Sequence, residues 1–114
     1  MHKSEIQACS IADAKRIQLT GDRSVQMFAH GSMRVKFYAP QGVDDQVPHR
    51  QDELYVVIDG TGTFGCGSAS MPFEPGTVLF APAGVEHRFE NFTDDFCTWV
   101  IFYGPDGGEQ GAAS

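Results

Sequence analysis

Two short segments of the sequence contain side chains that can bind a metal ion or transfer a proton. In the first, His49 and Glu53 precede the apolar run that begins at Leu54, and in the second His87 follows a Pro-Ala-Gly turn. Residues at even spacing lie on one side of an extended chain, so His49 and Glu53 can project together. An unpaired buried carboxylate costs several kcal/mol or takes up a proton. A bound divalent cation would remove that cost.

The elements that must position these side chains are strands. From Val25 onward, short runs rich in Val, Phe, Tyr and Ile alternate with Gly, Pro and Asp clusters, as is typical of strands and turns. Asp59-Gly60 lies between two such runs and predicts a type I′ hairpin. The fold class is therefore all-β, a sandwich or a barrel. We expect strands over residues 25–29, 32–38, 54–59, 61–65, 78–81, 86–90 and 96–103.

One short N-terminal helix is predicted from Ser10 to Ile17. Ser10 is a good N-cap and Asp13 follows it by three residues, while Ile11, Ala14 and Ile17 share one face. The remainder of the N-terminal region has no comparable pattern.

The chain has 114 residues, the size of one domain, and no repeat or linker is evident. We therefore expect a single domain over residues 1–114, with residues 1–24 as an N-terminal extension that carries the helix. Residues 104–114 have little apolar surface, and we expect them to form a mobile tail.

Charge and composition exclude several classes of partner. With 15 acidic and 8 basic residues the net charge is −7, and no basic cluster occurs, so neither nucleic acid nor a membrane surface is an expected partner. The start of the chain is too polar for a signal peptide, which makes a cytoplasmic location the expectation. Three widely spaced cysteines predict free thiols.

The second segment resembles the second motif of the cupin family, G-x5-P-x-G-x2-H-x3-N. Every fixed position of that motif is present, as Gly76, Pro82, Gly84, His87 and Asn91. The first cupin motif ends H-x-H-x3-4-E-x6-G. His49, Glu53 and Gly60 fit it, whereas Val47 stands where that motif has its first histidine.

This resemblance implies a cupin double-stranded β-helix with one metal ion inside the barrel. The family binds its metal through histidines and a glutamate, which correspond here to His49, Glu53 and His87. Two histidines and one carboxylate suit Fe²⁺ and would also hold Zn²⁺, Mn²⁺ or Ni²⁺, so the identity of the metal stays open. Gln51 or Gln46 could add an amide oxygen, and Gln51 is preferred because it shares the even spacing of His49 and Glu53.

Two residues are candidates for catalysis beside the metal. Glu53 could act as a base if a glutamine replaced it at the metal, and Tyr55 could place its hydroxyl near the ion. Arg34 and Lys36 alternate with Met33, Val35 and Phe37, which favours a solvated face over anion binding.

Two functions follow from these expectations. The first is a mononuclear metalloenzyme that acts on a small polar molecule, by dioxygenase-type or isomerase-type chemistry. The alternative is a barrel that binds or senses a small molecule without turnover. The resemblance to small cupins that adjoin edge strands also implies a homodimer.

Overall fold

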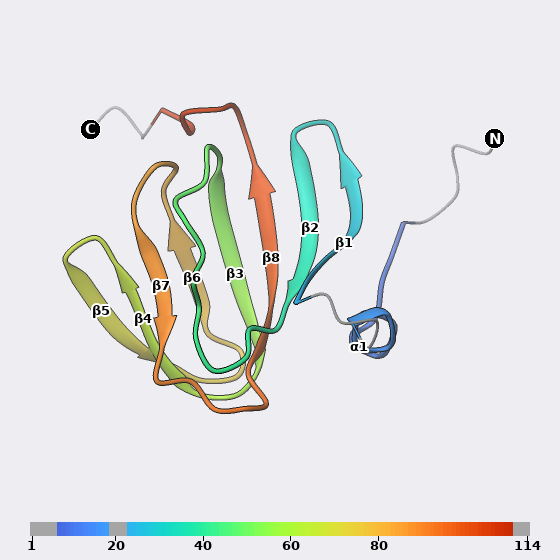
Figure 1. The fold of residues 1–114 in the computed structure, drawn as a ribbon. Helices are drawn as coiled ribbons and strands as arrows, with labels where there is room; N and C mark the ends of the chain where they lie inside the picture. Colours follow the sequence, from blue (N-terminus) through green and yellow to red (C-terminus); the bar gives the residue numbers. More distant parts are fainter. Residues whose placement is uncertain (1–6, 19–22, 111–114) are drawn as a thin grey trace.

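The computed structural model describes residues 7–18 and 23–110. Within these ranges, eight strands form two antiparallel sheets that wrap around a common interior, and one helix lies beside the larger sheet (Figure 1). The larger sheet has the strand order β1-β2-β8-β3-β6, and the smaller has the order β5-β4-β7. The expected all-β fold with one short N-terminal helix is thus confirmed.

The strands agree with those expected to within two residues at each end, and one was missed. They are β1 (Ser24–His30), β2 (Met33–Tyr38), β3 (Asp52–Asp59), β4 (Gly62–Cys66), β5 (Ala69–Phe73), β6 (Val78–Ala81), β7 (His87–Glu90) and β8 (Cys97–Tyr103). The missed strand, β5, contains Pro72 and forms one edge of the smaller sheet. An edge position tolerates proline because one side of the strand needs no hydrogen bonds.

The helix α1 (Ile11–Gln18) begins where its cap predicts. The hydroxyl of Ser10 accepts a hydrogen bond from the amide of Asp13 at 3.0 Å, and the Asp13 carboxylate accepts one from the Ser10 amide at 3.3 Å. This reciprocal pair satisfies amides that the first helical turn leaves free. Ala14 is buried in a small cluster with Phe37 of β2.

The hairpin predicted at Asp59-Gly60 is wrong. β3 pairs with β6 and β8, whereas β4 pairs with β5 and β7, so the chain passes from one sheet to the other at this point. Gly60 has φ +90°, and a Cβ there would lie 2.5 Å from the Cα of Phe96. The glycine is therefore required by a close backbone approach rather than by a two-residue hairpin turn.

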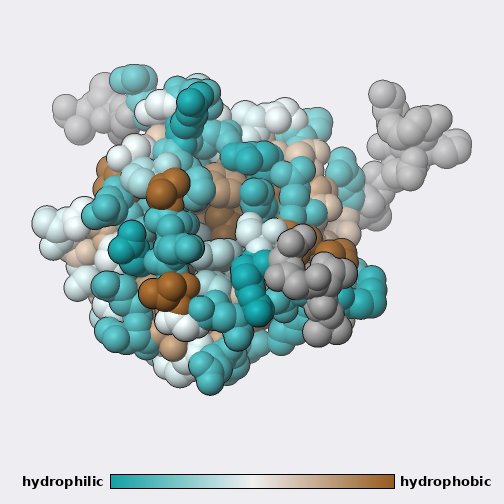
Figure 2. Space-filling view, in the orientation of Figure 1, coloured by the Kyte–Doolittle hydropathy of each residue, from teal (hydrophilic) through white to brown (hydrophobic). Residues whose placement is uncertain are grey.

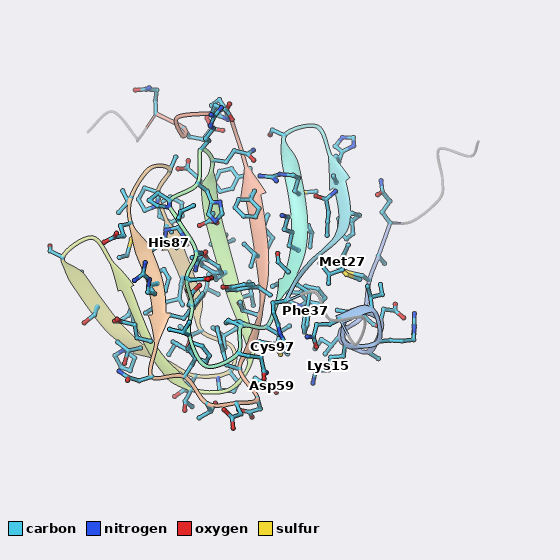
Figure 3. The ribbon with its side chains drawn as sticks, in the orientation of Figure 1. Lys15, Met27, Phe37, Asp59, His87 and Cys97 are labelled. Carbon is cyan, nitrogen blue, oxygen red and sulfur yellow. The ribbon has the colours of Figure 1, made fainter. Side chains whose placement is uncertain are left out.

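The main core lies between the sheets and is largely aromatic. Tyr55, Phe64, Phe89 and Phe102 are buried in it, as expected of a small barrel whose side chains fill the interior. Phe37 belongs instead to the second cluster on the outer face, where Figure 3 shows it near α1 and far from His87.

The first part of the expected C-terminal tail, residues 104–110, makes hydrogen bonds to the barrel. The amide of Gly107 donates to the carbonyl of Arg50 at 2.7 Å, and the amide of Glu109 donates to the carboxylate of Asp52 at 2.9 Å. Hydrogen bonds to Asp52 and Arg50, rather than apolar packing, hold this segment against the start of β3. Residues 111–114 lie outside the described part of the chain.

The surface agrees with the acidic, polar composition. The face of the molecule in Figure 2 is mostly hydrophilic, with small separate hydrophobic patches. Among the described residues no helix has the length and apolar character needed to span a membrane.

Candidate metal centre

Three elements bring the predicted ligands together. His49 lies in the loop before β3, Glu53 is the second residue of β3, and His87 is the first residue of β7. One ligand atom from each side chain lies within 4.8 Å of the others. The structure therefore assembles the three side chains that the sequence selects.

The turn at residues 82–85 is tied to the loop that carries His49. The amide of Gly84 donates to the carbonyl of His49 at 2.8 Å, and the amide of Ala83 donates to the Asp52 carboxylate at 2.9 Å. Gly84 has φ +77°, which favours glycine. Because these bonds join the two motif segments, they hold His49 and His87 at a fixed separation.

The closest contact at the site joins the side chains of Glu53 and His87. Nε2 of His87 lies 2.6 Å from Oε2 of Glu53, and the side chains of both are 1% exposed. Nδ1 of His87 lies 2.9 Å from the carbonyl of Val85, which fixes the proton on Nδ1 in the neutral ring and leaves a lone pair on Nε2. Nε2 of His87 and Oε1 of Glu53 are buried without a hydrogen-bond partner among the described residues. The facing lone pairs therefore require either a proton shared between them or a metal ion bound by both atoms.

His49 completes the group from the more open side. Its Nε2 lies 3.2 Å from Oε1 of Glu53, and its side chain is 34% exposed. Burial lowers the pKa of His49 below its usual range; the Glu53 carboxylate opposes this, while His87 and Lys36 add to it. The His49 ring is thus neutral near pH 7, the state in which imidazole binds metal.

In the protein without metal, the pKa of His87 is shifted the other way. Burial alone would lower it, but the Glu53 carboxylate and the Val85 carbonyl together raise it above the usual value. A proton thus occupies the position between Glu53 and His87 more readily, and a metal ion has to displace it.

Tyr55 lies beside this group, as expected, and connects it to a polar network. Its hydroxyl is 3.1 Å from Oε2 of Glu53 and 3.3 Å from Oε1 of Gln46, and it can donate its single proton to one of them at a time. Burial and the charge of Glu53 raise the pKa of Tyr55 far above its usual range. Tyr55 is therefore a hydrogen-bond donor at this site rather than an anionic base.

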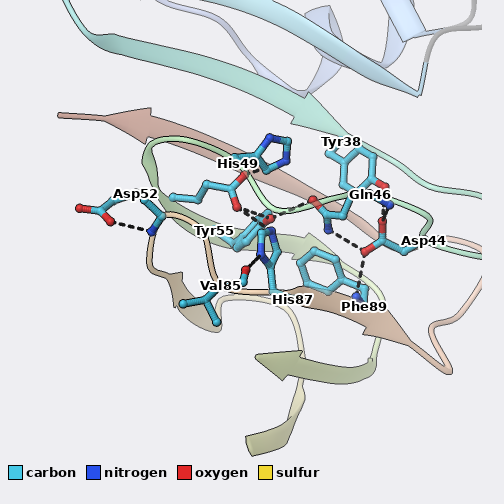
Figure 4. A network of polar contacts seen from close by, with 11 residues as sticks. Tyr38, Asp44, Gln46, His49, Asp52, Tyr55, Val85, His87 and Phe89 are labelled. Carbon is cyan, nitrogen blue, oxygen red and sulfur yellow. Dashed lines mark hydrogen bonds and ion pairs between the residues drawn. The ribbon is translucent and has the colours of Figure 1, made fainter. Parts of the chain in front are cut away.

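Asp44 anchors the other end of the network and was not anticipated from the sequence. Its buried carboxylate accepts hydrogen bonds from the hydroxyl of Tyr38, from the side chain of Gln46 at 2.6 Å and from the amide of Phe89 at 2.8 Å (Figure 4). An aspartate in a polar loop resembles a surface residue, and only its contact with β7 gives it this role.

The structure does not bring Gln51 to the three ligands. Its amide nitrogen donates to the carbonyls of Ser32 and Gly104 at 2.8 and 2.9 Å, and its oxygen accepts from Arg34 at 2.7 Å. The even-spacing argument fails because the chain bends at residues 50 and 51 before β3 begins. The other candidate, Gln46, contacts Tyr55 instead of the ligands, and Val47 is 68% exposed.

A cavity of about 220 Å³ opens beside the ligands. His49, Glu53 and Tyr55 line one part of it, and Val100 and Phe102 form an apolar wall. The donor set, one carboxylate and two imidazoles with an orphaned buried oxygen and nitrogen between them, fits a divalent transition-metal ion. Three protein ligands would leave positions open toward the cavity.

The prediction that Arg34 and Lys36 of β2 lie on a solvated face is wrong. Lys36 lines the cavity, and the guanidinium of Arg34 lies 4.5 Å from the centre of the Phe102 ring. Both are only partly exposed. The alternation was correct, but Val35 and Phe37 lie on the outer face of the sheet, so the charged residues point inward.

Comparison with known proteins agrees with this architecture. Residues 35–103 match the model of the cupin domain. Uncharacterized protein SCO3923 of Streptomyces coelicolor is 33% identical over 84 residues, which cover 72% of this chain and 80% of that protein.

Solved structures give the same result. An RmlC-like cupin family protein with a double-stranded β-helix fold from Methanocaldococcus jannaschii superposes with a TM-score of 0.65 at 10% identity, over 94% of this chain and 95% of that one. A chain from the crystal structures of the DMSP lyases RdDddP and RnDddQII has a TM-score of 0.57 at 28% identity, over 68% of this chain and 41% of that one. With both motif segments in one barrel and the domain model covering more than half of the sequence, the chain belongs to the cupin family.

Proposed function

We propose that this chain is a mononuclear metalloenzyme that acts on a small polar molecule. The observation that carries the proposal is the 2.6 Å approach of Nε2 of His87 to Oε2 of Glu53, with Nδ1 of the ring already committed to a carbonyl. A buried pair of this kind is costly unless a proton or a metal ion neutralises it. Its position beside an open cavity distinguishes it from a purely structural pair.

The metal would be held by His49, Glu53 and His87. When bound, such an ion supplies Lewis-acid polarisation of a substrate oxygen and fixes the orientation of the substrate. The donor set is compatible with Fe²⁺, Zn²⁺, Mn²⁺ and Ni²⁺. The remaining chemistry depends on the side chains around the cavity.

These side chains favour proton-transfer chemistry on a small carbonyl or carboxylate compound, as in isomerases and lyases. The hydroxyl of Tyr55 can donate its single proton toward Glu53 at the site or toward Gln46. Val100 and Phe102 exclude water from one wall. The similarity to a chain of the DMSP lyases, at 28% identity, supports this class of reaction over a dioxygenase.

Deuterium exchange tests the reaction class without knowledge of the product. Zinc-loaded and iron(II)-loaded protein would be incubated in D₂O with a panel of small hydroxy, keto and β-substituted acids, and exchange at carbon would be followed by proton NMR. We expect exchange or elimination with the metal-loaded protein and a loss of at least tenfold in Tyr55→Phe. Oxygen uptake without exchange would indicate dioxygenase chemistry, and binding without either would indicate a non-catalytic barrel.

A further inference from the structure

Lys36 is the residue near the candidate site whose position the chemistry above does not explain. In the large sheet, Lys36 of β2 pairs with Val100 of β8, which in turn pairs with Tyr55 of β3. The three residues therefore form one row across the inner face of the sheet, and all three line the cavity beside the metal ligands. The ammonium group lies 5.6 Å from the centre of the Phe102 ring.

Within the described part of the chain, the carboxylates of Glu53 and Asp45 line the same cavity as Lys36, but neither forms an ion pair with it. No ion pair or side-chain hydrogen bond of Lys36 occurs there, whereas its neighbour Arg34 donates to Gln51 at 2.7 Å. Lysine is rarely drawn into a protein interior without a partner, because its charge loses hydration there. Burial accordingly lowers the pKa of Lys36, the charge of Arg34 adds to this effect, and the charge of Glu53 opposes it.

The charges around the cavity favour an anion. Lys36 and Arg34 are positive, and a divalent ion would more than neutralise Glu53. Asp45, the other carboxylate that lines the cavity, belongs to an exposed residue. With a divalent ion bound, the ion and Lys36 carry more positive charge than Glu53 and Asp45 carry negative charge, so a ligand with one negative charge would be attracted to the cavity.

We propose that Lys36 binds the anionic group of a small organic acid whose opposite end faces His49, Glu53 and His87. The cavity of about 220 Å³ corresponds to about seven water volumes, which limits the acid to a small metabolite. The proposal rests on the proposed function for the metal end of the ligand, and it adds the class of substrate. Phe102, between the imidazole of His49 and the Lys36 ammonium, forms the apolar surface for the connecting carbons.

A pair of hydroxamates tests the carboxylate subsite separately from the metal. Both butanohydroxamate and succinate monohydroxamate present a metal-binding hydroxamate, but only the second has a terminal carboxylate. Their dissociation constants for zinc-loaded protein would be measured by calorimetry. We expect the wild type to prefer the carboxylated probe by tenfold or more, and Lys36→Met to reduce this preference to less than threefold.

Matched variants separate the charge from other effects. Lys36→Arg should retain most of the preference, and Lys15→Met, which removes an exposed lysine paired with Asp59 on the surface, should leave it unchanged. Zinc affinity should stay within threefold of wild type in all three variants. An undiminished preference in Lys36→Met, in a variant that still binds zinc, would overturn the subsite and leave the metalloenzyme intact.

The opposite failure has its own readout. If zinc does not bind the wild type, the proposed function fails, and the subsite is tested on metal-free protein with butanoate and its neutral isostere butanamide. A preference for butanoate that Lys36→Met removes would support the anion subsite alone. Equal binding of the two probes, or none of either, would refute it.

Discussion

Glu53→Gln separates the metal-binding role of the site from its structural role. Glu53 lies against Nε2 of His87 at 2.6 Å and against Nε2 of His49 at 3.2 Å, and its side chain is 1% exposed. The substitution keeps the size of the side chain but removes its charge. His87 can then become neutral, and the new amide can donate to its Nε2. Large losses of stability at buried pairs usually arise because one charge stays buried without a partner. Glu53→Gln leaves no such charge.

The expected magnitudes differ with and without metal. Without metal, we expect the free energy of unfolding to change by less than about 1 kcal/mol, because the lost ion pair is offset by the desolvation that is no longer needed. With zinc at one hundred times its dissociation constant, the wild type gains about 2.7 kcal/mol. Loss of a direct ligand weakens affinity by about 100-fold or more, so at the same zinc concentration the variant gains about 0.4 kcal/mol or less.

Urea denaturation with and without zinc measures both quantities. Asp52→Asn is the matched control, because Asp52 is also buried but accepts amide hydrogen bonds from Ala83 and Glu109. We expect it to lose about 1 to 3 kcal/mol in both conditions and to keep most of the gain from zinc, because the amide of Gly84 still donates to the carbonyl of His49. A Glu53→Gln variant that is strongly destabilised without metal, yet gains as much from zinc as the wild type, would refute the reasoning.

Three further predictions concern the fold, the pH dependence and the assembly. In urea denaturation, Gly60→Ala should lower the free energy of unfolding by more than about 3 kcal/mol, because the new Cβ would meet the backbone of Phe96. Gly76 has the same φ of +90° but no atom within 4 Å of the position that a Cβ would take, so Gly76→Ala should cost only about 1 kcal/mol. Similar losses would contradict the close approach. The pKa of His87 is raised in the metal-free fold, so protonation of His87 stabilises the folded state. This stabilisation is fully present below the pKa of about 6.5 in the unfolded chain, and it is lost as pH rises through the pKa in the folded state. The stability difference between the wild type and His87→Gln should therefore shrink toward high pH without metal, and a growing difference would contradict the assignment. We expect light scattering to show a homodimer. Phe80 lies on edge strand β6 and is 47% exposed, so Phe80→Lys should convert the dimer to a monomer. A monomeric wild type would contradict this prediction.

Strand alternation predicted the inner face where the chain is extended and failed where it bends. Glu53 and Tyr55 both lie in β3, and both side chains are buried at the site as expected. Gln51 has the same parity but precedes the strand, so its amide reaches Ser32 and Gly104 instead. Local patterns do not specify where a strand's first hydrogen-bonded residue lies, because tertiary pairing decides it.

The inward orientation of Lys36 shows a second limit of sequence patterns. On β2 the charged residues alternate with Val35 and Phe37, which is ordinarily taken to mean that the charged side faces water. Here the outer face of the sheet is itself apolar, since Val35 pairs with Ile101 and Phe37 pairs with Trp99. Alternation identifies two faces, but only the arrangement of the sheets decides which of them encloses the cavity.

The unanticipated role of Asp44 has a similar cause. Its hydrogen bonds join the loop before β3 to the amide of Phe89, a residue 45 positions away in the chain. A local pattern contains no information on such a pairing. His49, Glu53 and His87 could be selected because they stand at the ligand positions of the two cupin motifs that the sequence resembles.

Anomalous diffraction from zinc-soaked crystals tests the central claim most directly. The account predicts one anomalous peak per chain, about 2.0 to 2.2 Å from Nε2 of His49, a carboxylate oxygen of Glu53 and Nε2 of His87. The absence of a peak at these atoms, with the three side chains ordered and zinc present in the crystal, would contradict it.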